Sequence, residues 1–430
     1  MRILFVSAGY LPSNIGGVEL HVHNIAKEFK KQGHDVLVFA RDYAPGKPEF
    51  NLERSMYEDV PVARMNYKFS DCTTFEKLYS NSAIARIFRE VLQEFAPDVV
   101  HVHHLSCLTT DIVPMVKGMN IPIAMTLHDF WMGCPRGQRI KASLRNCSEI
   151  RLNQCVPCLR ELWPSFFQGG RDGISKAEAE EHDTEMLENY HTHIHNILES
   201  VDRLITPSKF MKDIYVRYGI SKSKITVVEN GLDHALYKNM SPKRSPMTRF
   251  GYIGSVLPSK GIHILIDAFK RIGGSDLSLH IWGEVLPFHK DTNYGHRLAV
   301  LTKGWESAIQ FHGRYENHDL PEILSNLDVL IVPSIWYEAF CLTLREAFLA
   351  GVPVIASNFG AMAEAVENGE TGLLFNVGDS VDLSEKMKML MTHPALRIKL
   401  AESPKKVATI TENVLGLKKV YSEITGQPVD

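Results

Sequence analysis

The sequence predicts an α/β protein built from two doubly wound domains in tandem. Three observations carry this prediction: a strand–loop–helix–strand unit in the first forty residues, a second such series from about residue 250, and a linker-like segment at 237–249 between them. Strands that alternate with helices form a parallel sheet covered on both faces. Ligands of such folds bind where strands end in loops, so we expect the site in a cleft between the domains.

The first series opens with a βαβ unit. Residues 2–7 and 35–40 are apolar runs of strand length, and residues 18–32 carry apolar side chains at helical spacing until Gly33 and His34 end the helix. A turn-rich loop at 10–17 joins the first strand to this helix. Further predicted strands lie at 98–103, 122–127, 203–206 and 225–228.

The second series repeats the alternation. A strand at 250–254 and a helix at 262–272 are followed by predicted strands at 277–282, 309–312, 329–332 and 354–356. We therefore expect an N-terminal domain at 1–236 and a C-terminal domain at 237–405. A final helix at 406–430 is expected to pack back on the N-terminal domain.

One block, at about residues 131–200, does not follow the alternation and is interpreted as an insertion in the first domain. It holds four cysteines, a run of basic residues and then an acidic stretch at 176–200 with helical spacing. Before it, residues 75–95 are amphipathic, which suits a core-facing helix as well as one that touches a membrane.

Composition and charge exclude several classes of protein. Apolar residues make up 44% of the chain and charged residues 23%, unlike disordered, collagen-like or disulfide-stapled proteins. The net charge of -3 lacks the basic excess of a nucleic-acid-binding protein, so no nucleic-acid partner is expected. The 7 cysteines are unevenly spaced, which favours a reducing compartment over a secreted disulfide framework.

No targeting or spanning segment is evident. The apolar run at 3–8 is too short for a signal-peptide core. The most apolar region, 328–357, carries Glu338, Arg345 and Glu346, whereas a membrane span needs ~20 nearly uncharged residues. We expect a cytoplasmic protein; a peripheral contact with the inner face of the cell membrane is the alternative.

The densest group of candidate site residues follows the predicted strand at 329–332. Glu338 lies just before a predicted helix at 341–349, and Glu346 lies in its second turn. Free backbone N–H groups at a helix start bind phosphate, and a carboxylate on each side suits sugar hydroxyls. For the two glutamates alone, a helix cap and a solvated helix position would be the simpler explanation.

Other candidate residues also lie at loops that follow strands. Lys260 ends a loop before the helix at 262–272, where its charge suits a phosphate. Gly16 and Gly17 open the first helix, where the backbone can approach a ligand closely. His128 follows the strand at 122–127, and Asn230 follows the strand at 225–228.

Taken in order, these motifs resemble the retaining nucleotide-sugar glycosyltransferases of family 4, which have the GT-B fold. The resemblance spans nearly the whole chain apart from the insertion. Its most specific part is Glu338 and Glu346 with seven residues between them, followed by the motifs at 350–356 and 371–374. It implies two Rossmann-like domains that face each other across a cleft, with the nucleotide sugar on the C-terminal one.

The resemblance also implies roles for single residues. Glu346 would hydrogen-bond the ribose and Glu338 the donor sugar, while Lys260 and the backbone amides near 340–343 would bind the diphosphate. His128 would lie against the donor sugar near the reacting centre, so His128, Glu338 and Lys260 are the catalytic candidates. The donor-binding candidates are Gly16, Gly17, Asn230, Ser255, Phe340, Cys341, Leu342, Thr343 and Glu346.

Two departures from the family pattern bear on function. The family has an arginine after the glycine at position 254, and this chain has Ser255. Leaving-group stabilisation would then depend on Lys260, helix amides or a basic residue from elsewhere. The glycines usual on either side of Phe340 are Ala339 and Cys341, small residues that we expect the fold to tolerate.

The mechanism implied by the resemblance is transfer with retention at the anomeric carbon. The acceptor would attack from the front face within one oxocarbenium-like ion pair, and the leaving diphosphate would take its proton. No second carboxylate pair points to a double displacement. No catalytic divalent metal is expected for this type of enzyme, and the sequence has no Asp-x-Asp motif.

The four cysteines of the insertion follow the spacing C-x12-C-x7-C-x2-C. One close pair in a set of four suits a tetrahedral structural zinc ion, with Cys134, Cys147, Cys155 and Cys158 as ligands. An iron–sulfur cluster on these thiolates is the second alternative, and thiols without a metal are the third. Cys72, Cys107 and Cys341 are interpreted as ordinary packing residues.

The cysteine-containing part of the insertion begins at Cys134, six residues after His128, so we expect it to border the reaction cleft. Its basic residues before residue 173 are Arg136, Arg139, Lys141, Arg145, Arg151, Arg160 and Arg171. A basic lobe favours an anionic acceptor such as a phosphate-linked lipid or an acidic glycan. A solvated surface balanced by the acidic helix that follows explains the charges equally well.

The sequence as a whole predicts a hexosyltransferase-type retaining glycosyltransferase. It would move a sugar from a UDP- or GDP-linked donor to a glycan or lipid-linked acceptor, in the synthesis of cell-envelope polysaccharide or another glycoconjugate. The alternatives are a nucleotide-sugar epimerase of the same fold and, because of Ser255, a nucleotide-sugar-binding protein without transferase activity.

Overall fold

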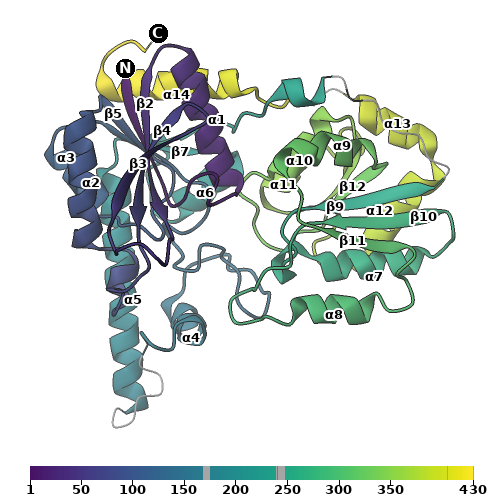
Figure 1. Cartoon of the computed structure of the whole chain (residues 1–430). Coiled ribbons are helices and arrows are strands. Elements are labelled where there is room, and N and C mark those ends of the chain that lie inside the picture. Colours follow the sequence, from purple (N-terminus) through teal and green to yellow (C-terminus); the bar gives the residue numbers. More distant parts are fainter. Residues whose placement is uncertain (168–174, 239, 241–246, 404, 430) are drawn as a thin grey trace. The chain divides into compact units, whose positions relative to one another are not determined.

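The computed structural model describes the whole chain except residues 168–174, 239, 241–246, 404 and 430, and it divides into two compact units (Figure 1). The first unit comprises Met1–Gln138, Glu149–Gly231 and Ala408–Asp430, and the second comprises Arg139–Ser148 and Leu232–Val407. Each unit is built on one sheet with helices on both faces. The predicted fold class, two doubly wound α/β domains, is confirmed.

Within its described residues, the first unit has an eight-stranded sheet in the order β3-β4-β2-β1-β5-β6-β7-β8. All neighbouring strands are parallel except β3 and β4. The strands are β1 (Arg2–Ser7), β2 (Asp35–Asp42), β3 (Leu52–Tyr57), β4 (Val60–Asn66), β5 (Val99–Val102), β6 (Ile123–Thr126), β7 (Arg203–Thr206) and β8 (Ile225–Val227).

Helices cover both faces of this first sheet. Neighbouring strand residues point to opposite faces, so Val38 packs with α1 and α14 while Phe39 meets Phe88 of α2. The helices are α1 (Gly17–Lys31), α2 (Ser82–Phe95), α3 (Ile112–Gly118), α4 (Leu152–Leu162), α5 (Lys176–Ser200), α6 (Lys209–Arg217) and α14 (Ile410–Thr425).

The second unit has, in its described part, a six-stranded parallel sheet in the order β11-β10-β9-β12-β13-β14. Numbered within this unit the order is 3-2-1-4-5-6, that of a doubly wound nucleotide-binding fold. The strands are β9 (Thr248–Ile253), β10 (Leu277–Trp282), β11 (Ile309–Gly313), β12 (Val329–Val332), β13 (Val354–Ser357) and β14 (Leu373–Phe375).

Two apolar layers enclose this second sheet. Leu279 packs with α7 on one face, and Leu330 packs with α10 on the other. The helices are α7 (Ile262–Ile272), α8 (Tyr294–Leu301), α9 (Leu320–Ser325), α10 (Leu342–Leu349), α11 (Gly360–Ala365), α12 (Ser380–Thr392) and α13 (Pro394–Glu402).

The observed units differ from the expected domains in two places. The first unit ends at Gly231, five residues before the expected limit, and resumes at Ala408. Residues Arg139–Ser148, expected in the first domain, belong to the second unit because Ile140 is buried in its core. Of the predicted linker at 237–249, residues 239 and 241–246 lie outside the described residues, and β9 begins at Thr248.

The final helix, α14, belongs to the first unit and packs beside α1 (Figure 1). A capping box between Thr409 and Glu412 starts it. Tyr421 is fully buried: its ring stacks on Phe29 at a centroid distance of 5.6 Å, and its hydroxyl lies 2.6 Å from His101 Nδ1.

The amphipathic stretch at 75–95 is explained by burial within the first unit. The apolar face of α2, including Ile84, Phe88 and Leu92, is buried. Among the described helices, none combines the length and the apolar character that crossing a membrane requires.

Candidate active site

Glu338 lies in the loop between β12 and α10, where three donors hold one of its oxygens. Lys260 Nζ and Ser334 Oγ each donate to Oε1 over 2.7 Å, and Trp336 Nε1 donates to it over 2.8 Å. The residue is 7% exposed. No described residue donates to Oε2, so this oxygen is the one that can accept a hydrogen bond from a ligand.

The donors around Glu338 decide its charge. Burial alone would raise the pKa of this carboxyl, but the Lys260 ammonium and the hydrogen bonds from Ser334 and Trp336 outweigh burial and lower it. Glu338 is therefore a buried carboxylate that stays ionised at neutral pH.

A glycine allows Lys260 to reach Glu338. Lys260 ends a short 3-10 turn, η4 (Pro258–Lys260), and Gly261 follows it with a φ of +74°. A Cβ on Gly261 would lie 2.0 Å from the carbonyl oxygen of Pro333, so glycine is required for this close approach. Lys260 Nζ also lies 5.0 Å from the centre of the Trp336 ring, a cation–π contact.

The start of α10 has an unusual backbone at Cys341, whose φ is +61°. This left-handed conformation favours glycine, which accounts for the glycine that the family usually has there. Arg345 supports the turn from within the helix, since its guanidinium lies 3.5 Å from the Phe340 ring centre and donates to the Phe340 carbonyl. Leu342 and Thr343 form the half-buried first turn that follows.

Glu346, one turn farther along α10, has a different environment from Glu338. Burial raises its pKa to about 7. It lies near Tyr237 and Tyr315, and burial together with the Glu346 carboxyl raises the pKa of Tyr315 to about 12. Glu346 therefore titrates near neutral pH.

The remaining donor-site candidate of the second unit is Ser255. It is exposed in the loop after β9, and its carbonyl accepts a hydrogen bond from the Tyr252 hydroxyl over 2.7 Å. Its side chain adds no charge where the family has an arginine. Lys260 is thus the cation that the structure places beside Glu338.

Three donor-site candidates lie in the first unit. Gly16 is the N-cap of α1 and Gly17 is its first residue, so both lie at a helix N-terminus. A Cβ on Gly16 would come within 2.6 Å of Glu19 Oε2. Asn230 is 5% exposed and follows β8.

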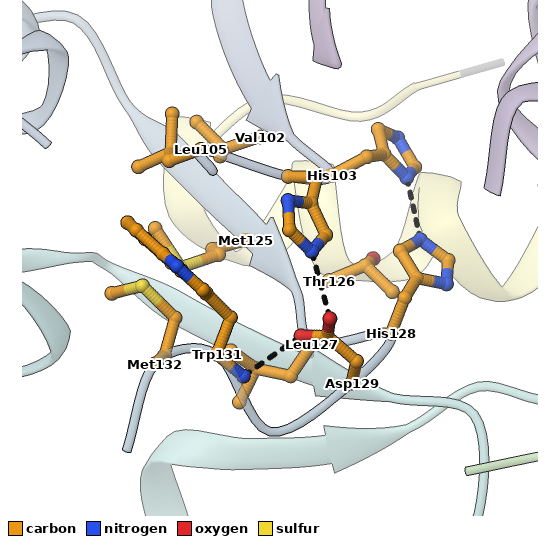
Figure 2. A pocket seen from close by; sticks show the side chains of 11 residues that line it. Val102, His103, Leu105, Met125, Thr126, Leu127, His128, Asp129, Trp131 and Met132 are labelled. Carbon is orange, nitrogen blue, oxygen red and sulfur yellow. Dashed lines mark hydrogen bonds and ion pairs between the residues drawn. The ribbon is translucent and has the colours of Figure 1, made fainter. Parts of the chain in front are cut away.

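His128 lines a pocket of the first unit at the carboxyl ends of β5 and β6 (Figure 2). His104 Nε2 lies 2.9 Å from Asp129 Oδ2, and the Trp131 amide donates to Asp129 Oδ1 over 2.9 Å. The lining residues of the pocket are Val102, His103, His104, Leu105, Met125, Thr126, Leu127, His128, Asp129, Trp131 and Met132.

Helices α5 and α6 hold the loop that carries this pocket. The Tyr190 hydroxyl donates to the Trp131 carbonyl over 2.7 Å, and the Tyr215 hydroxyl donates to the Asp129 carbonyl over 2.9 Å. The long acidic helix of the insertion is therefore a support for the His128 loop.

The pKa values of the pocket histidines are shifted in opposite directions. Burial and, after it, the neighbouring imidazoles lower the pKa of His128 and His103 far below the usual value, so both are neutral. Burial also lowers the pKa of His104, but the Asp129 and Glu19 carboxylates outweigh it and raise the net value.

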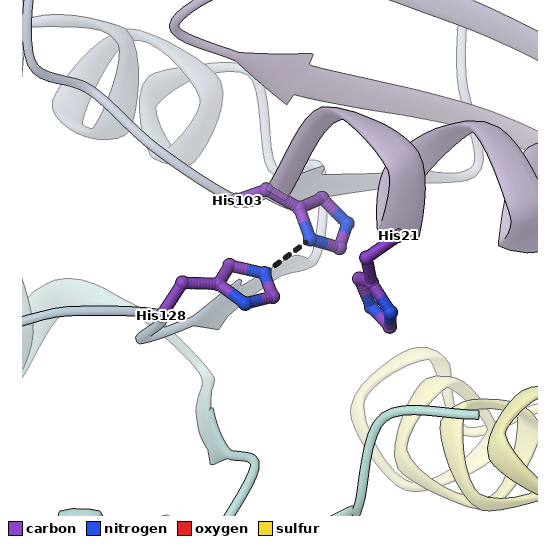
Figure 3. Close-up of side chains that lie close together, drawn as sticks. All are labelled: His21, His103 and His128. Carbon is purple, nitrogen blue, oxygen red and sulfur yellow. Dashed lines mark hydrogen bonds between the residues drawn. The ribbon is translucent and has the colours of Figure 1, made fainter. Parts of the chain in front are cut away.

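His21, His103 and His128 form a cluster that the sequence analysis missed (Figure 3). His103 Nδ1 lies 2.9 Å from His128 Nε2, and His21 on α1 completes a trio of nitrogen atoms that lie within 4.8 Å of one another. In the described part of the chain, this is the group that could present three ligands to a metal ion. That catalysis needs no divalent metal stays a prediction.

The cysteines of the insertion divide between the units. Cys134, Cys155 and Cys158 belong to the first unit, whereas Cys147 belongs to the second. Cys155 and Cys158 lie one turn apart on α4. The structural zinc ion, or an iron–sulfur cluster in its place, stays a prediction.

Most basic residues of the insertion are engaged inside it. The pairs are Arg136 with the Cys158 sulfur, Arg139 with the carbonyls of Cys147 and Ser148, Arg151 with Glu149, and Arg160 with Asp183. Arg171 lies outside the described residues. Arg151 and Arg160 are thus paired with carboxylates, whereas Arg136 and Arg139 bond to neutral groups and keep their positive charge.

The sequence analysis also missed two residues that donate hydrogen bonds to Glu338, namely Ser334 and Trp336. Both lie within four residues of Glu338 in the same loop, and this proximity of a hydroxyl and an indole N–H to a buried carboxylate was the available signal. Of the catalytic candidates, the structure brings Glu338 and Lys260 together.

The chain matches two family descriptions. Residues 15–156 and 179–236 match the family described as "Glycosyltransferase Family 4", and residues 236–407 match "Glycosyl transferases group 1". The two matches together span most of the chain and leave out part of the insertion.

Individual proteins of known name are similar to this chain over nearly its whole length. A glycogen synthase of Mycobacterium tuberculosis is 26% identical, over 92% of this chain and 87% of that protein. A sucrose-phosphate synthase of Thermosynechococcus elongatus has a similar fold, with a TM-score of 0.71, 19% identity and coverage of 99% of both chains. The Anabaena protein HepE, solved with UDP and glucose, has a TM-score of 0.66 at 18% identity, over 98% of this chain and 100% of that one.

Proposed function

Because the chain belongs to the glycosyltransferases of family 4, with the GT-B fold, we propose that it transfers a sugar from a UDP- or GDP-linked donor to a glycan or lipid-linked acceptor with retention at the anomeric carbon. The observation that carries the proposal is the Glu338 carboxylate. Lys260 and two further donors hold it ionised through Oε1, and Oε2 is available to a ligand.

We assign the donor to the second unit. Glu338 Oε2 accepts a hydroxyl of the donor sugar, Lys260 and the amides at the start of α10 bind the diphosphate, and Glu346 accepts the ribose hydroxyls. Helix N-termini and lysine both bind phosphate groups in proteins. The complex of HepE with UDP and glucose supports a nucleotide sugar as the donor.

The proposed reaction exchanges one bond at the anomeric carbon. The bond to the diphosphate oxygen breaks, the acceptor oxygen bonds to the same face, and the acceptor proton passes to the departing diphosphate. Negative charge grows on the diphosphate as it leaves, and Lys260 and the α10 amides stabilise it. Ser255 contributes no charge, so Lys260 carries a larger share of this stabilisation than in a site with two cations.

We assign the acceptor to the pocket of the first unit. Trp131 offers an aromatic ring and Asp129 a carboxylate, a combination that suits a molecule with sugar hydroxyls. His128 acts there as a neutral hydrogen-bonding group, because burial lowers its pKa. Among the described basic residues of the insertion, Arg136 and Arg139 bond to neutral groups and keep their charge, so an anionic acceptor such as a phosphate-linked lipid or an acidic glycan stays part of the proposal.

The first experiment measures release of nucleoside diphosphate from a panel of UDP- and GDP-sugars. We expect slow hydrolysis of one donor by the wild-type protein and at least a tenfold lower rate for Glu338→Gln, which keeps the shape of the side chain and removes its charge. An exposed glutamate on α12, replaced in Glu385→Gln, is the matched control and should leave the rate unchanged.

Three outcomes would contradict the proposal. Equal rates for wild type and Glu338→Gln would remove Glu338 from the donor site. Recovery of an altered nucleotide sugar would indicate an epimerase. Binding of a donor with no product, even with a panel of glycan and lipid-linked acceptors, would indicate a binding protein without transferase activity.

A further inference from the structure

The hairpin Arg139–Ser148 belongs to the second unit although both flanking segments belong to the first. Ile140 and Asn146 form an antiparallel bridge, and the Lys141 amide donates to the Arg145 carbonyl over 3.0 Å. The Arg139 guanidinium closes the base of the hairpin by donating to two of its carbonyls. The hairpin is thus a defined structure within the insertion.

Apolar side chains fix the hairpin on the second unit. Ile140 is 1% exposed in the core cluster that also contains Val256 and Ile335. Leu144, near the tip, packs against the same cluster. The hairpin therefore covers the segment that leads to Glu338.

A hydrogen bond fixes the same segment from the hairpin. Asn146 Nδ2 donates to the Ile335 carbonyl over 2.6 Å, and the Ile335 amide donates to the Ser259 carbonyl over 2.9 Å. Both polar backbone atoms of Ile335 are thus engaged, one by the hairpin and one by the turn that carries Lys260.

Ile335 immediately precedes Trp336, which contacts both members of the Glu338–Lys260 pair. The Trp336 indole donates to Glu338 Oε1, and its ring faces Lys260 Nζ. A shift of the Ile335 peptide would move this indole, and with it the hydrogen bond that orients the carboxylate. The hairpin acts on Glu338 only through this chain of contacts.

We propose that the hairpin is a component of the donor site, with Asn146 as a positioning residue for Glu338. The inference rests on the proposed function, because it takes Glu338 as the group that binds the donor sugar. The hairpin should then affect recognition of the sugar, whereas the nucleotide, assigned to Glu346 and the start of α10, should bind as before.

The test uses titration calorimetry on the full-length protein to compare two pairs of ligands, UDP-glucose with UDP and GDP-mannose with GDP. For Asn146→Ala we expect affinity for the nucleotide sugar to fall about threefold to tenfold, as for the loss of one hydrogen bond. Affinity for the nucleoside diphosphate should stay within about twofold. Glu385→Gln, at an exposed position of α12 outside the hairpin, should leave both affinities unchanged.

A second variant, Asn146→Asp, keeps the size of the side chain and removes the N–H group that donates to the Ile335 carbonyl. Its affinity for the nucleotide sugar should therefore fall at least as much as that of Asn146→Ala. If both Asn146 variants bind the nucleotide sugar as the wild type does, the inference is wrong. Equal losses for nucleotide sugar and nucleoside diphosphate would show a general structural role and also overturn it. If the Asn146 variants do not fold, Ile140→Val gives the same comparison with a milder change. A wild-type protein that binds no nucleotide sugar would overturn the proposed function itself.

Discussion

The two glutamates of the candidate donor site have opposite protonation behaviour because their neighbours differ. Lys260 and two neutral donors surround Glu338 and lower its pKa. Glu346 has tyrosines near it, and burial raises its pKa to about 7. One carboxylate is therefore charged throughout the physiological range, while the charge of the other depends on pH.

This difference predicts a pH-dependent gain in stability for Glu346→Gln. The pKa of Glu346 is about 7 in the folded protein and about 4.5 in the unfolded chain, so the folded state binds the proton more tightly. The contribution of Glu346 to stability is therefore fully present below pH 4.5 and falls as pH rises to about 7. Glutamine removes this loss, so Tm should rise more at pH 8 than at pH 5.

Thermal unfolding of wild type and Glu346→Gln at pH 5 and pH 8 tests whether the gain in Tm is larger at the higher pH. Glu385→Gln, on the exposed side of α12, is the control and should show no difference between the two pH values. A larger gain at pH 5 than at pH 8 would contradict the assignment of a raised pKa to Glu346.

Among the helices, α4 and α5 are joined by an ion pair whose acidic partner is fully buried. Arg160 Nε lies 2.6 Å from Asp183 Oδ2, and the Asp183 side chain is 0% exposed. Arg160 also donates to the Ala179 carbonyl over 3.0 Å. In the same insertion, Arg151 pairs with Glu149 on the surface, where both side chains are more than half exposed.

These two ion pairs predict very different effects of removing the arginine. Arg160→Met removes the arginine that pairs with the buried Asp183 carboxylate and should lower the free energy of unfolding by roughly 3 kcal/mol. Arg151→Met should leave the free energy of unfolding almost unchanged, because an exposed pair contributes little. Unfolding in urea measures both, and equal effects would show that the Arg160 pair does not hold α4 on α5.

Most elements of both sheets could be predicted because apolar runs of strand length are a local signal. The strands at Arg2–Ser7, Arg203–Thr206, Leu277–Trp282 and Val329–Val332 have the predicted bounds. The antiparallel strands β3 and β4 were missed, since β3 is half exposed and has no apolar run. The unit to which Arg139–Ser148 belongs could not be predicted, because it depends on where Ile140 is buried.

The sequence allowed us to name residues of the candidate site, but it did not predict the contacts between them. Glu338 and Lys260 were found because each follows a strand and precedes a helix, as the family resemblance also implies. That they meet depends on the close approach of Gly261 to Pro333, which the sequence does not show. His21 was missed because a helical position gave no sign that it would meet two strand-end histidines.

In the molecule as a whole, the chain returns to the first unit in α14. Residues near both ends of the sequence therefore pack in the same core. Tyr421 fills part of the first unit's core, and its hydroxyl is the partner of His101 Nδ1. His101 is itself fully buried on β5. The last helix is thus an integral part of the first unit's fold.

Tyr421→Phe should therefore lower the free energy of unfolding by about 1–2 kcal/mol, because it leaves a buried imidazole nitrogen without its partner. Tyr43→Phe, which removes a hydroxyl from a side chain that is 58% exposed, should change it by less than about 0.5 kcal/mol. Chemical denaturation of the three proteins measures the difference. Equal stability of Tyr421→Phe and wild type would mean that the hydroxyl does not stabilise α14 in its position.

The crossing of the chain at Arg139–Ser148 also determines how this enzyme can be recombined with its relatives. A graft of one continuous stretch, Leu232–Val407, would leave Ile140 behind and open a void in the transplanted core. A chimera that exchanges the second unit must carry both stretches and join them at four junctions instead of two. In this protein the second unit is discontinuous in sequence, so its exchange takes four crossovers in the gene, two more than a continuous internal segment would need.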